Sequence, residues 1–442
     1  IQHFPKDFIF GTATSSYQIE GSKLGNCGES HWDTFSKRKN TIFKNQDGSV
    51  ACKHIDNWEQ DLDLVADAGF GAYRFSFSWP RILKDGQKEK NYKGISFYDQ
   101  LIDGMLERGI RPFATLYHWD LPQALAATGG WTNRDTCEWF ADYTELVMKQ
   151  FGDRLFSIAT LNEPWCVAWL SYYLGEHAPG LKSFSAAVEA MHQILLAHGK
   201  SLAVLKDLGH KNVGIVLNET YLQPASQSNA DLSARNLCDE IYNRWFLEAI
   251  FNGQYPTKAL KLFENLMPKN FQDDLHLINQ KLDWLGINYY TREIVKNDKT
   301  EKNLGFKTYH GNLPKTAMGW EIFPEGIFKI LTTIMDEYSK LVPIHITENG
   351  LANPDYIKNG HINDVDRIRF YEEHLMQIKA LIETGVPVKS YFAWSLLDNF
   401  EWAHGYEKRF GLVYVDFDTQ KRIPKKSYFD YKNALTQKKH KT

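Results

Sequence analysis

The most constraining feature of this sequence is a repeated unit, in which an amphipathic helix ends at a glycine and an apolar run follows. In the clearest copy, residues 58–68 have apolar side chains at helical spacing, Gly69 comes next, and residues 73–79 form the apolar run. The corresponding glycines of three further copies are Gly109, Gly209 and Gly385. Glycine is favoured just after a helix because it adopts left-handed backbone angles without a Cβ clash. The repeat therefore predicts helices that alternate with strands.

Eight apolar runs fit this alternation and are expected to be strands. They are residues 8–13, 73–79, 112–119, 156–161, 213–218, 284–288, 344–347 and 388–394. Strands that alternate with helices run parallel and are joined by right-handed crossovers. Eight such units are the number in a closed (β/α)₈ (TIM) barrel, which is the α/β fold that we predict. An open doubly wound sheet is the alternative, but its G-x-G-x-x-G fingerprint is absent.

The length of 442 residues exceeds what one hydrophobic core usually organises. Barrels are the exception, because one closed sheet can support a long chain. No linker rich in proline, serine or glycine divides the sequence. We therefore predict a single catalytic barrel domain over residues 1–442, with the excess length in long loops inserted after the strands.

Composition excludes several classes of protein. The chain is 43% hydrophobic and 24% charged, which is ordinary for a globular protein and argues against a disordered or fibrous one. No stretch approaches the roughly 20 apolar residues of a membrane helix. The net charge of −3 provides no basic surface for nucleic acid. Neither a membrane nor a nucleic acid is expected as a partner, and the oligomeric state is left open.

The cysteines and the N-terminus bear on compartment and on metals. Five cysteines are scattered without a CxxC pair or a Cys/His ligand spacing, which predicts reduced thiols and no metal site. The first residues, from Ile1 to Pro5, do not resemble a signal peptide, so we expect a cytoplasmic protein.

Aromatic residues with polar edges are abundant. The chain has 13 Trp and 22 Tyr, and a core uses Phe and Leu more readily because the polar atoms of Trp and Tyr need partners. A flat ring with a polar edge suits a ligand that is equally amphipathic. The surplus therefore favours a binding cleft for a sugar.

Polar and aromatic residues gather where the predicted strands end. They include Gln18, Arg74, His118, Trp119, Asn162, Glu163, Asn218, Asn288, Tyr290, Glu348, Trp394, Glu401 and Trp402. Any one of the Asn or Glu residues could simply cap the next helix. Catalysis in such barrels takes place at the carboxyl ends of the strands. Because all eight predicted strands end in polar or aromatic residues, we expect the active site there.

Two carboxylates, Glu163 and Glu348, end the fourth and seventh predicted strands, which lie nearly opposite in a ring of eight. Hydrolysis of a glycosidic bond needs such a pair: one carboxyl protonates the departing oxygen, and the other attacks the anomeric carbon or activates water. A barrel metallohydrolase would instead have His-x-His on the first strand, which this chain lacks.

Three motifs in the expected order resemble the signatures of glycoside hydrolase family 1, the β-glucosidase family. They are residues 8–21 (FIFGTATSSYQIEG), 160–164 (TLNEP) and 346–350 (ITENG), and the resemblance extends over essentially the whole chain. It implies a (β/α)₈ barrel and a retaining hydrolase without a cofactor. The implied substrates are small β-glucosides or short β-linked oligosaccharides, with terminal non-reducing β-D-glucosyl residues released.

The resemblance also implies roles for single residues. Glu163 matches the acid/base and Glu348 the nucleophile, with Arg74 and Tyr290 beside the nucleophile. Positions that bind the non-reducing sugar are matched by Gln18, His118, Trp119, Asn162, Glu401 and Trp402. The remaining matches are Trp394 and Phe410 as floor and wall of the sugar pocket, Asn288 beside the acid/base, Trp320 on the leaving-group side, and His177 and Asn218 beside the leaving group or behind the sugar.

Two other functions remain as alternatives. A 6-phospho-β-glycosidase would have a phosphate-binding arrangement in place of Glu401 and Trp402, and a carboxylate there would repel the phosphate. A barrel that only binds glycans typically lacks one catalytic Glu, whereas both are present here. Because Gln18 and Glu401 can accept either orientation of a hydroxyl, galactosides and fucosides are expected as further substrates.

Overall fold

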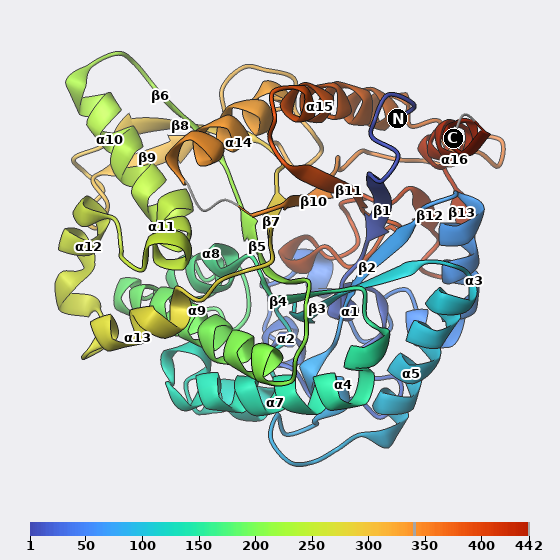
Figure 1. The fold of residues 1–442 in the computed structure, drawn as a ribbon, viewed down its shortest axis with the longest axis horizontal. Helices are drawn as coiled ribbons and strands as arrows, with labels where there is room; N and C mark the ends of the chain where they lie inside the picture. Colours follow the sequence, from blue (N-terminus) through green and yellow to red (C-terminus); the bar gives the residue numbers. More distant parts are fainter. Residues whose placement is uncertain (339–341, 441–442) are drawn as a thin grey trace.

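The computed structural model describes residues 1–338 and 342–440 and contains a closed barrel of eight parallel strands. Its order is β1-β11-β10-β7-β5-β4-β3-β2. In Figure 1 the strands occupy the middle of the molecule and the helices surround them. The barrel strands are β1 (Ile9–Ala13), β2 (Ala72–Ser76), β3 (Arg111–Tyr117), β4 (Ser157–Asn162), β5 (Val213–Asn218), β7 (Trp284–Asn288), β10 (Ile344–Asn349) and β11 (Val388–Trp394).

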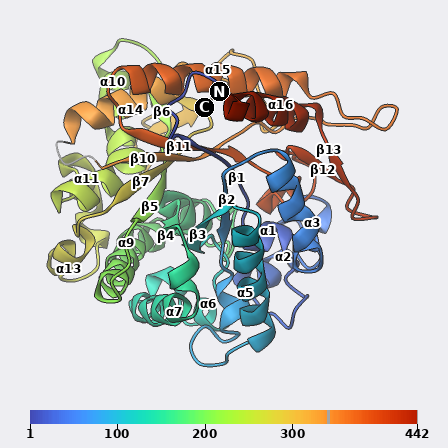
Figure 2. The ribbon, with the colours of Figure 1, turned by 45° about the vertical axis from the view of Figure 1, so that its right-hand side comes forward.

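The main helices lie between successive barrel strands, except α16, which follows the last one. They are α3 (His54–Asp67), α5 (Tyr92–Glu107), α7 (Asp135–Phe151), α9 (Phe184–Asp207), α10 (Asn229–Asp239), α11 (Trp245–Asn252), α12 (Thr257–Phe263), α13 (Phe271–Ile278), α14 (Glu325–Glu337), α15 (Val365–Glu383) and α16 (Lys426–His440). Shorter helices in the loops are α1 (Ser16–Ile19), α2 (His31–Ser36), α4 (Trp79–Ile82), α6 (Gln123–Ala127) and α8 (Pro164–Ala168). The N-terminal segment and α16 lie side by side in both views (Figures 1 and 2).

The predicted barrel is confirmed, and all eight predicted strands are present with limits that differ by a few residues. The second strand ends at Ser76 because Trp79 already begins α4, with Pro80 in the first helical turn where proline is favoured. The seventh extends to Asn349 because Glu348 still pairs with Asn288 of β7. The glycines that follow α3 and α15, Gly69 and Gly385, have φ of +81° and +95°, as a helix-ending glycine requires.

Two small sheets that the sequence analysis did not predict lie outside the barrel. One has the order β6-β8-β9, formed by Tyr221–Pro224, Arg292–Asn297 and Phe306–Tyr309, and the other pairs β12 (Val413–Val415) with β13 (Arg422–Pro424). Most residues of β6, β8 and β9 are at least partly exposed. Strands of this kind have no continuous apolar run, so the pattern that identified the barrel strands could not identify them.

The hydrophobic core occupies the barrel interior and the layer between the barrel and its helices. Every residue of β2 and β4 is buried, as expected of parallel strands covered by helices. Four tryptophans, Trp79, Trp131, Trp169 and Trp245, are fully buried in this core, and Trp32 is fully buried in a separate cluster with Trp402. The abundance of tryptophan therefore reflects the core as well as a cleft, and the indole N–H of Trp79, for example, donates to the Gly86 carbonyl at 3.0 Å.

The five cysteines are unpaired; Cys27 is half-buried and the other four are buried. Among the described helices, none combines the length and the apolar character that a membrane crossing requires.

Candidate active site

A cavity of about 390 Å³ opens at the carboxyl ends of the barrel strands. Of the site residues that the sequence analysis named, thirteen line it: His118, Trp119, Glu163, His177, Asn218, Asn288, Tyr290, Trp320, Glu348, Trp394, Glu401, Trp402 and Phe410. The other three, Gln18, Arg74 and Asn162, are buried directly behind these residues and hydrogen-bond to them. The structure thus brings all sixteen together.

Glu348 lies at the end of β10 in a strongly polar environment. Arg74 of β2 donates from Nη1 to Glu348 Oε1 at 2.5 Å, and Tyr290 donates its hydroxyl to Oε2 at 2.6 Å. Burial raises the pKa of Tyr290 well above its ordinary value, so the phenol keeps the proton that it donates. A cation and a hydroxyl donor together stabilise the ionised form of Glu348.

Glu163 follows β4 and is the residue before α8. Its φ is +50°, a left-handed conformation that is uncommon for a residue with a side chain, and Pro164 after it begins the helix. Asn288 donates from Nδ2 to Glu163 Oε1 at 2.6 Å. Burial, and next the negative charge of Glu348, raise the pKa of Glu163 to about 7, while the Asn288 hydrogen bond opposes this shift.

Asn162 connects the surroundings of the two glutamates. Its Oδ1 accepts from Arg74 Nη2 at 2.7 Å and from Asn288 Nδ2 at 3.1 Å. Because that oxygen faces two donors, Nδ2 points the other way and donates to His118 Nε2 at 3.2 Å. Burial, and next the charge of Arg74, hold the pKa of His118 well below its ordinary value, so its imidazole is neutral.

A third carboxyl, Glu401, lines the same cavity. Gln18 Nε2 donates to Glu401 Oε2 at 3.3 Å and to the side-chain oxygen of Asn399 at 3.0 Å. Burial, and next the negative charge of Glu348, raise the pKa of Glu401 to about 8. Glu163, Glu348 and Glu401 are thus buried carboxyls that share one cavity, and Arg74 pairs with Glu348.

Aromatic rings form the walls. The imidazole of His118 lies nearly parallel to Trp394 and to Trp402, with centroids 5.8 and 6.2 Å apart. Tyr290 and Trp320 have centroids 5.4 Å apart, both rings approach Phe410 at 6.2 Å, and both pack against the cluster that contains Phe410 and Trp394. Apolar ring faces beside buried carboxyls suit a molecule that has C–H faces and hydroxyl edges, as a pyranose does.

His177 lies against the indoles of Trp119 and Trp32, with centroids 5.3 and 5.2 Å away. Burial lowers the pKa of His177 to about 3, so the ring is neutral. Trp119 and Trp402 have φ of +81° and +48°, so left-handed backbone recurs at this site. Backbone outliers of this kind cluster where the surrounding structure fixes a functional geometry.

Thirteen further lining residues were not among the site residues that the sequence analysis proposed. They are Trp165, Cys166, Leu170, Leu174, Glu176, Glu219, Thr220, Tyr242, Thr291, Glu293, Thr308, Met318 and His404. Trp165 and Cys166 directly follow the 160–164 motif, so their place in the first turn of the next helix was the signal available. Tyr242, Glu293 and Thr308 come from the inserted segments around the β6-β8-β9 sheet, where no apolar run indicates a strand. No group of three His, Cys, Asp or Glu side chains in the described part of the chain is arranged to hold a metal ion.

Comparison with known proteins identifies relatives over the whole length. The model of Glycosyl hydrolase family 1 matches residues 1–440. The chain is 45% identical to a 1,4-beta-D-glucan glucohydrolase of Thermotoga neapolitana, with 98% of each protein covered. It is 41% identical to a bifunctional beta-D-glucosidase/beta-D-fucosidase of Bifidobacterium breve, again with 98% of each covered.

A solved structure agrees equally well. The beta-glucosidase from Thermotoga maritima in complex with galacto-hydroximolactam superposes with a TM-score of 0.95 at 43% identity, covering 99% of both chains. The fold, the cavity with its paired glutamates and the full-length family match lead to one conclusion: the chain belongs to glycosyl hydrolase family 1.

Proposed function

We propose that the protein is a retaining β-glucosidase that removes terminal non-reducing β-D-glucosyl residues from small β-glucosides or short β-linked oligosaccharides. The observation that supports this best is the contrast between two glutamates in one cavity. Glu348 pairs with a guanidinium, whereas the pKa of Glu163 is raised to about 7. A charged nucleophile beside a carboxylic acid that keeps its proton near neutral pH is the arrangement that glycoside hydrolysis requires.

In the first step, a carboxylate oxygen of Glu348 attacks the anomeric carbon while the bond from that carbon to the leaving-group oxygen breaks. Glu163 gives its proton to this oxygen, so the products are an alcohol and a glucosyl ester of Glu348. Tyr290 and Arg74 hold the attacking carboxylate in place through the hydrogen bonds at 2.6 and 2.5 Å.

In the second step, Glu163 is a carboxylate and takes a proton from water as the water oxygen attacks the anomeric carbon. The ester bond breaks, Glu348 regains its charge and Glu163 regains its proton. Burial and the negative charge of Glu348 raise the pKa of Glu163, and esterification removes that charge, so the same residue changes from acid to base between the steps. Two inversions at one carbon retain the β configuration, as is general in this family.

The non-reducing glucosyl unit is proposed to lie on Trp394, with Phe410 as a further wall. Its hydroxyls would bind Gln18, His118, Trp119, Asn162, Glu401 and Trp402. Trp320, His177 and Asn218 line the same cavity and are proposed to face the leaving group or support those that do. We take the whole chain as one catalytic domain, which the family match over residues 1–440 supports. The unpaired cysteines suit a reducing compartment such as the cytoplasm.

A panel of 4-nitrophenyl glycosides tests the proposal. The purified protein is assayed on the β-glucoside, β-galactoside, β-fucoside and 6-phospho-β-glucoside, with the anomeric form of the released sugar followed by proton NMR. We expect β-glucose as the first product and no hydrolysis of the phosphorylated sugar. The β-fucoside is expected to be hydrolysed as well. Faster turnover of the 6-phosphoglucoside than of the glucoside would contradict the substrate assignment, and α-glucose as first product would contradict retention.

A further inference from the structure

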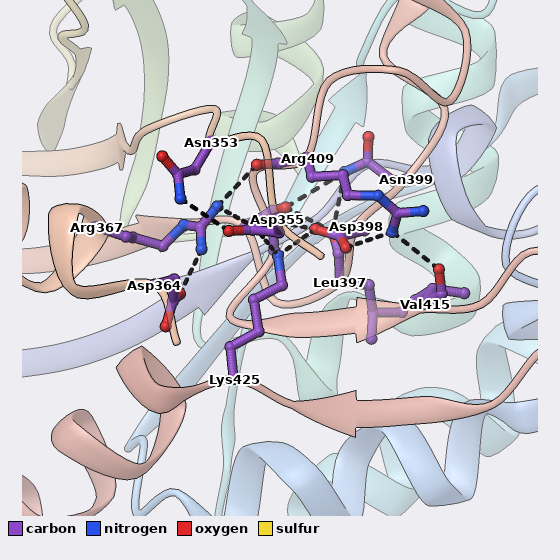
Figure 3. A network of polar contacts seen from close by, with 12 residues as sticks. Asn353, Asp355, Asp364, Arg367, Leu397, Asp398, Asn399, Arg409, Val415 and Lys425 are labelled. Atoms are coloured by element: carbon purple, nitrogen blue, oxygen red, sulfur yellow. Dashed lines mark hydrogen bonds and ion pairs between the residues drawn. The ribbon is translucent and has the colours of Figure 1, made fainter. Parts of the chain in front are cut away.

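Behind the sugar cavity lies a network of six charged side chains, drawn in Figure 3. Three acids alternate with three bases: Asp355, Asp364, Asp398, Arg367, Arg409 and Lys425. All except Arg409 have side chains with 1% or less of their surface exposed. The charges balance, so each buried ion has partners of opposite sign.

Within this network, Asp398 binds two of the three bases, Lys425 and Arg409. Its Oδ1 accepts from Lys425 Nζ at 2.6 Å and from the backbone N–H of Gly411 at 2.9 Å, and its Oδ2 accepts from Arg409 Nη1 at 2.7 Å. Asp398, Arg409 and Gly411 all belong to the segment between β11 and β12, residues 395–412, which we call the sugar loop. Asp398 therefore links the beginning of the sugar loop to its end.

The sugar loop contains three of the proposed sugar contacts, Glu401, Trp402 and Phe410. Phe410 lies between the two residues that Asp398 binds, and Glu401 follows Asp398 by three positions. Asn399, next to Asp398, accepts the hydrogen bond from Gln18, whose amide also donates to Glu401. A shift of Asp398 is thus transmitted to Glu401 along the chain and through Gln18.

The same network reaches the loop that follows the nucleophile strand. Lys425 Nζ also donates to Asp355 Oδ2 at 2.6 Å, and Arg367 Nη2 donates to Asp355 at 2.7 Å and to the carbonyl of Arg409 at 2.8 Å. Asp355 lies in residues 350–364, which leave β10 just after Glu348. Lys425 therefore bridges the loop behind the nucleophile and the sugar loop.

We propose that Asp398 and Lys425 are positioning residues, which fix Glu401 relative to Glu348 through the sugar loop. This inference rests on the proposed function and adds residues that do not line the cavity. Buried ion pairs contribute little to stability compared with apolar side chains of the same volume, but their directional hydrogen bonds can specify one geometry. A displacement of about 1 Å at a reacting centre lowers the rate by up to about 10²-fold. Ion pairs that hold Glu401 in place can therefore affect the rate of hydrolysis.

The test is a double-mutant cycle between Lys425→Met and Glu401→Ser. Each single variant, the double variant and the wild type are assayed for kcat/KM on 4-nitrophenyl β-glucoside and for the Kd of deoxynojirimycin by calorimetry. We expect Lys425→Met to lower kcat/KM by about 10–100-fold and to weaken the iminosugar, with KM raised as well as kcat lowered. In the Glu401→Ser background the same change is expected to lower kcat/KM by less than about threefold. The effect of Lys425 is transmitted through Glu401, which this variant lacks.

Arg134→Met is the control, which removes a cation from a carboxylate elsewhere in the fold. Arg134 forms two hydrogen bonds with the buried Asp274, at 2.7 and 2.5 Å, between the α7 and α13 region and away from the sugar loop. Its loss destabilises the fold without moving Glu401, so kcat/KM is expected to stay within about twofold of the wild type. Asp398→Asn, which keeps an acceptor for the Gly411 N–H, replaces Lys425→Met if that variant does not fold.

The possible outcomes distinguish a failure of the positioning role from a failure of the proposed function. A Lys425→Met or Asp398→Asn protein with the Kd and kcat/KM of the wild type overturns the positioning role. An equal loss in both Glu401 backgrounds overturns it too, since the residues would then act independently. A wild type that binds the iminosugar and hydrolyses no β-glucoside contradicts the proposed function instead, while the Kd values still decide the positioning role.

Discussion

Arg74 Nη1 donates to Glu348 Oε1 at 2.5 Å, and both side chains are almost completely buried. The second guanidinium nitrogen, Nη2, binds Asn162, so the cation cannot turn toward Glu163 without breaking that contact. The guanidinium thus favours the charged form of Glu348, and that charge in turn contributes to the raised pKa of Glu163. The ion pair with Arg74 thus gives Glu348 and Glu163 different chemical environments, although their side chains are identical.

The first prediction concerns pH. Glu163 must be protonated at the start of the cycle and its pKa is about 7, so kcat/KM is expected to fall about tenfold per pH unit above that value. The measurement is kcat/KM for cellobiose, whose poor leaving group needs the proton, between pH 4 and 10 in buffers of constant ionic strength. A plateau that extends beyond pH 9 would exclude Glu163 as the acid with this pKa.

The second prediction separates acid catalysis from a structural role of Glu163. A good leaving group needs little protonation, so Glu163→Gln is expected to keep rapid formation of the glucosyl ester from a dinitrophenyl glucoside. Hydrolysis of cellobiose is expected to fall by about 10²–10⁴-fold. Pre-steady-state release of dinitrophenol measures the first step. Equal losses for both substrates would mean that Glu163 does not protonate the leaving group.

The third prediction concerns Glu401. The buried Glu401 carboxyl can bond two adjacent hydroxyls, and these bonds stabilise the transition state when they tighten as the ring flattens. Glu401→Ser is therefore expected to lower kcat/KM on β-glucosides by about 10²–10³, or roughly 2.7–4 kcal/mol. If Glu401 merely caps its loop, the variant will lose thermal stability and keep kcat/KM almost unchanged.

The fourth prediction links the same residue to stability. The pKa of Glu401 is raised to about 8 in the folded protein, so between the ordinary value of 4.5 and 8 the folded state binds more protons than the unfolded state. The free energy of unfolding consequently falls as pH rises through this window. Glu401→Gln removes that term, and its Tm should exceed the wild-type Tm by a margin that grows from pH 5 to pH 8 and then levels off. Calorimetry at one scan rate measures it; a margin independent of pH would contradict the raised pKa.

Sequence patterns were sufficient for the barrel because its strands are short, apolar and punctuated by glycines. The glycine after α3 has the positive φ that the pattern requires. The positions of Glu163 and Glu348 could also be predicted, because both lie at strand ends that the barrel brings to one face. Trp320, Phe410 and His177 were expected only from the family resemblance. The limits of the strands were harder to predict. The apolar run that contains β2 continues to Trp79, yet Trp79 and Pro80 begin a helix.

What the sequence could not provide depends on contacts between distant segments. The network around Asp398 joins residues separated by as many as 70 positions, such as Asp355 and Lys425, and no local pattern signals such a pairing. The β6-β8-β9 sheet was missed because its strands are half exposed, and with it Tyr242 and Glu293 on the cavity wall. The pKa values of about 7 and 8 likewise arise from burial and mutual repulsion, which exist only in the fold.

The most direct test of the central claim, that Glu348 is the nucleophile of a retaining β-glucosidase, is chemical rescue of Glu348→Gly. The variant should hydrolyse 4-nitrophenyl β-glucoside at less than about 10⁻⁴ of the wild-type rate, because removing the nucleophile abolishes the covalent step. Azide added to the assay should restore turnover by attacking from the vacated face. Proton NMR should then identify α-glucosyl azide, the product of a single inversion. Wild-type activity without azide, or a β-glucosyl azide product, would contradict the assignment.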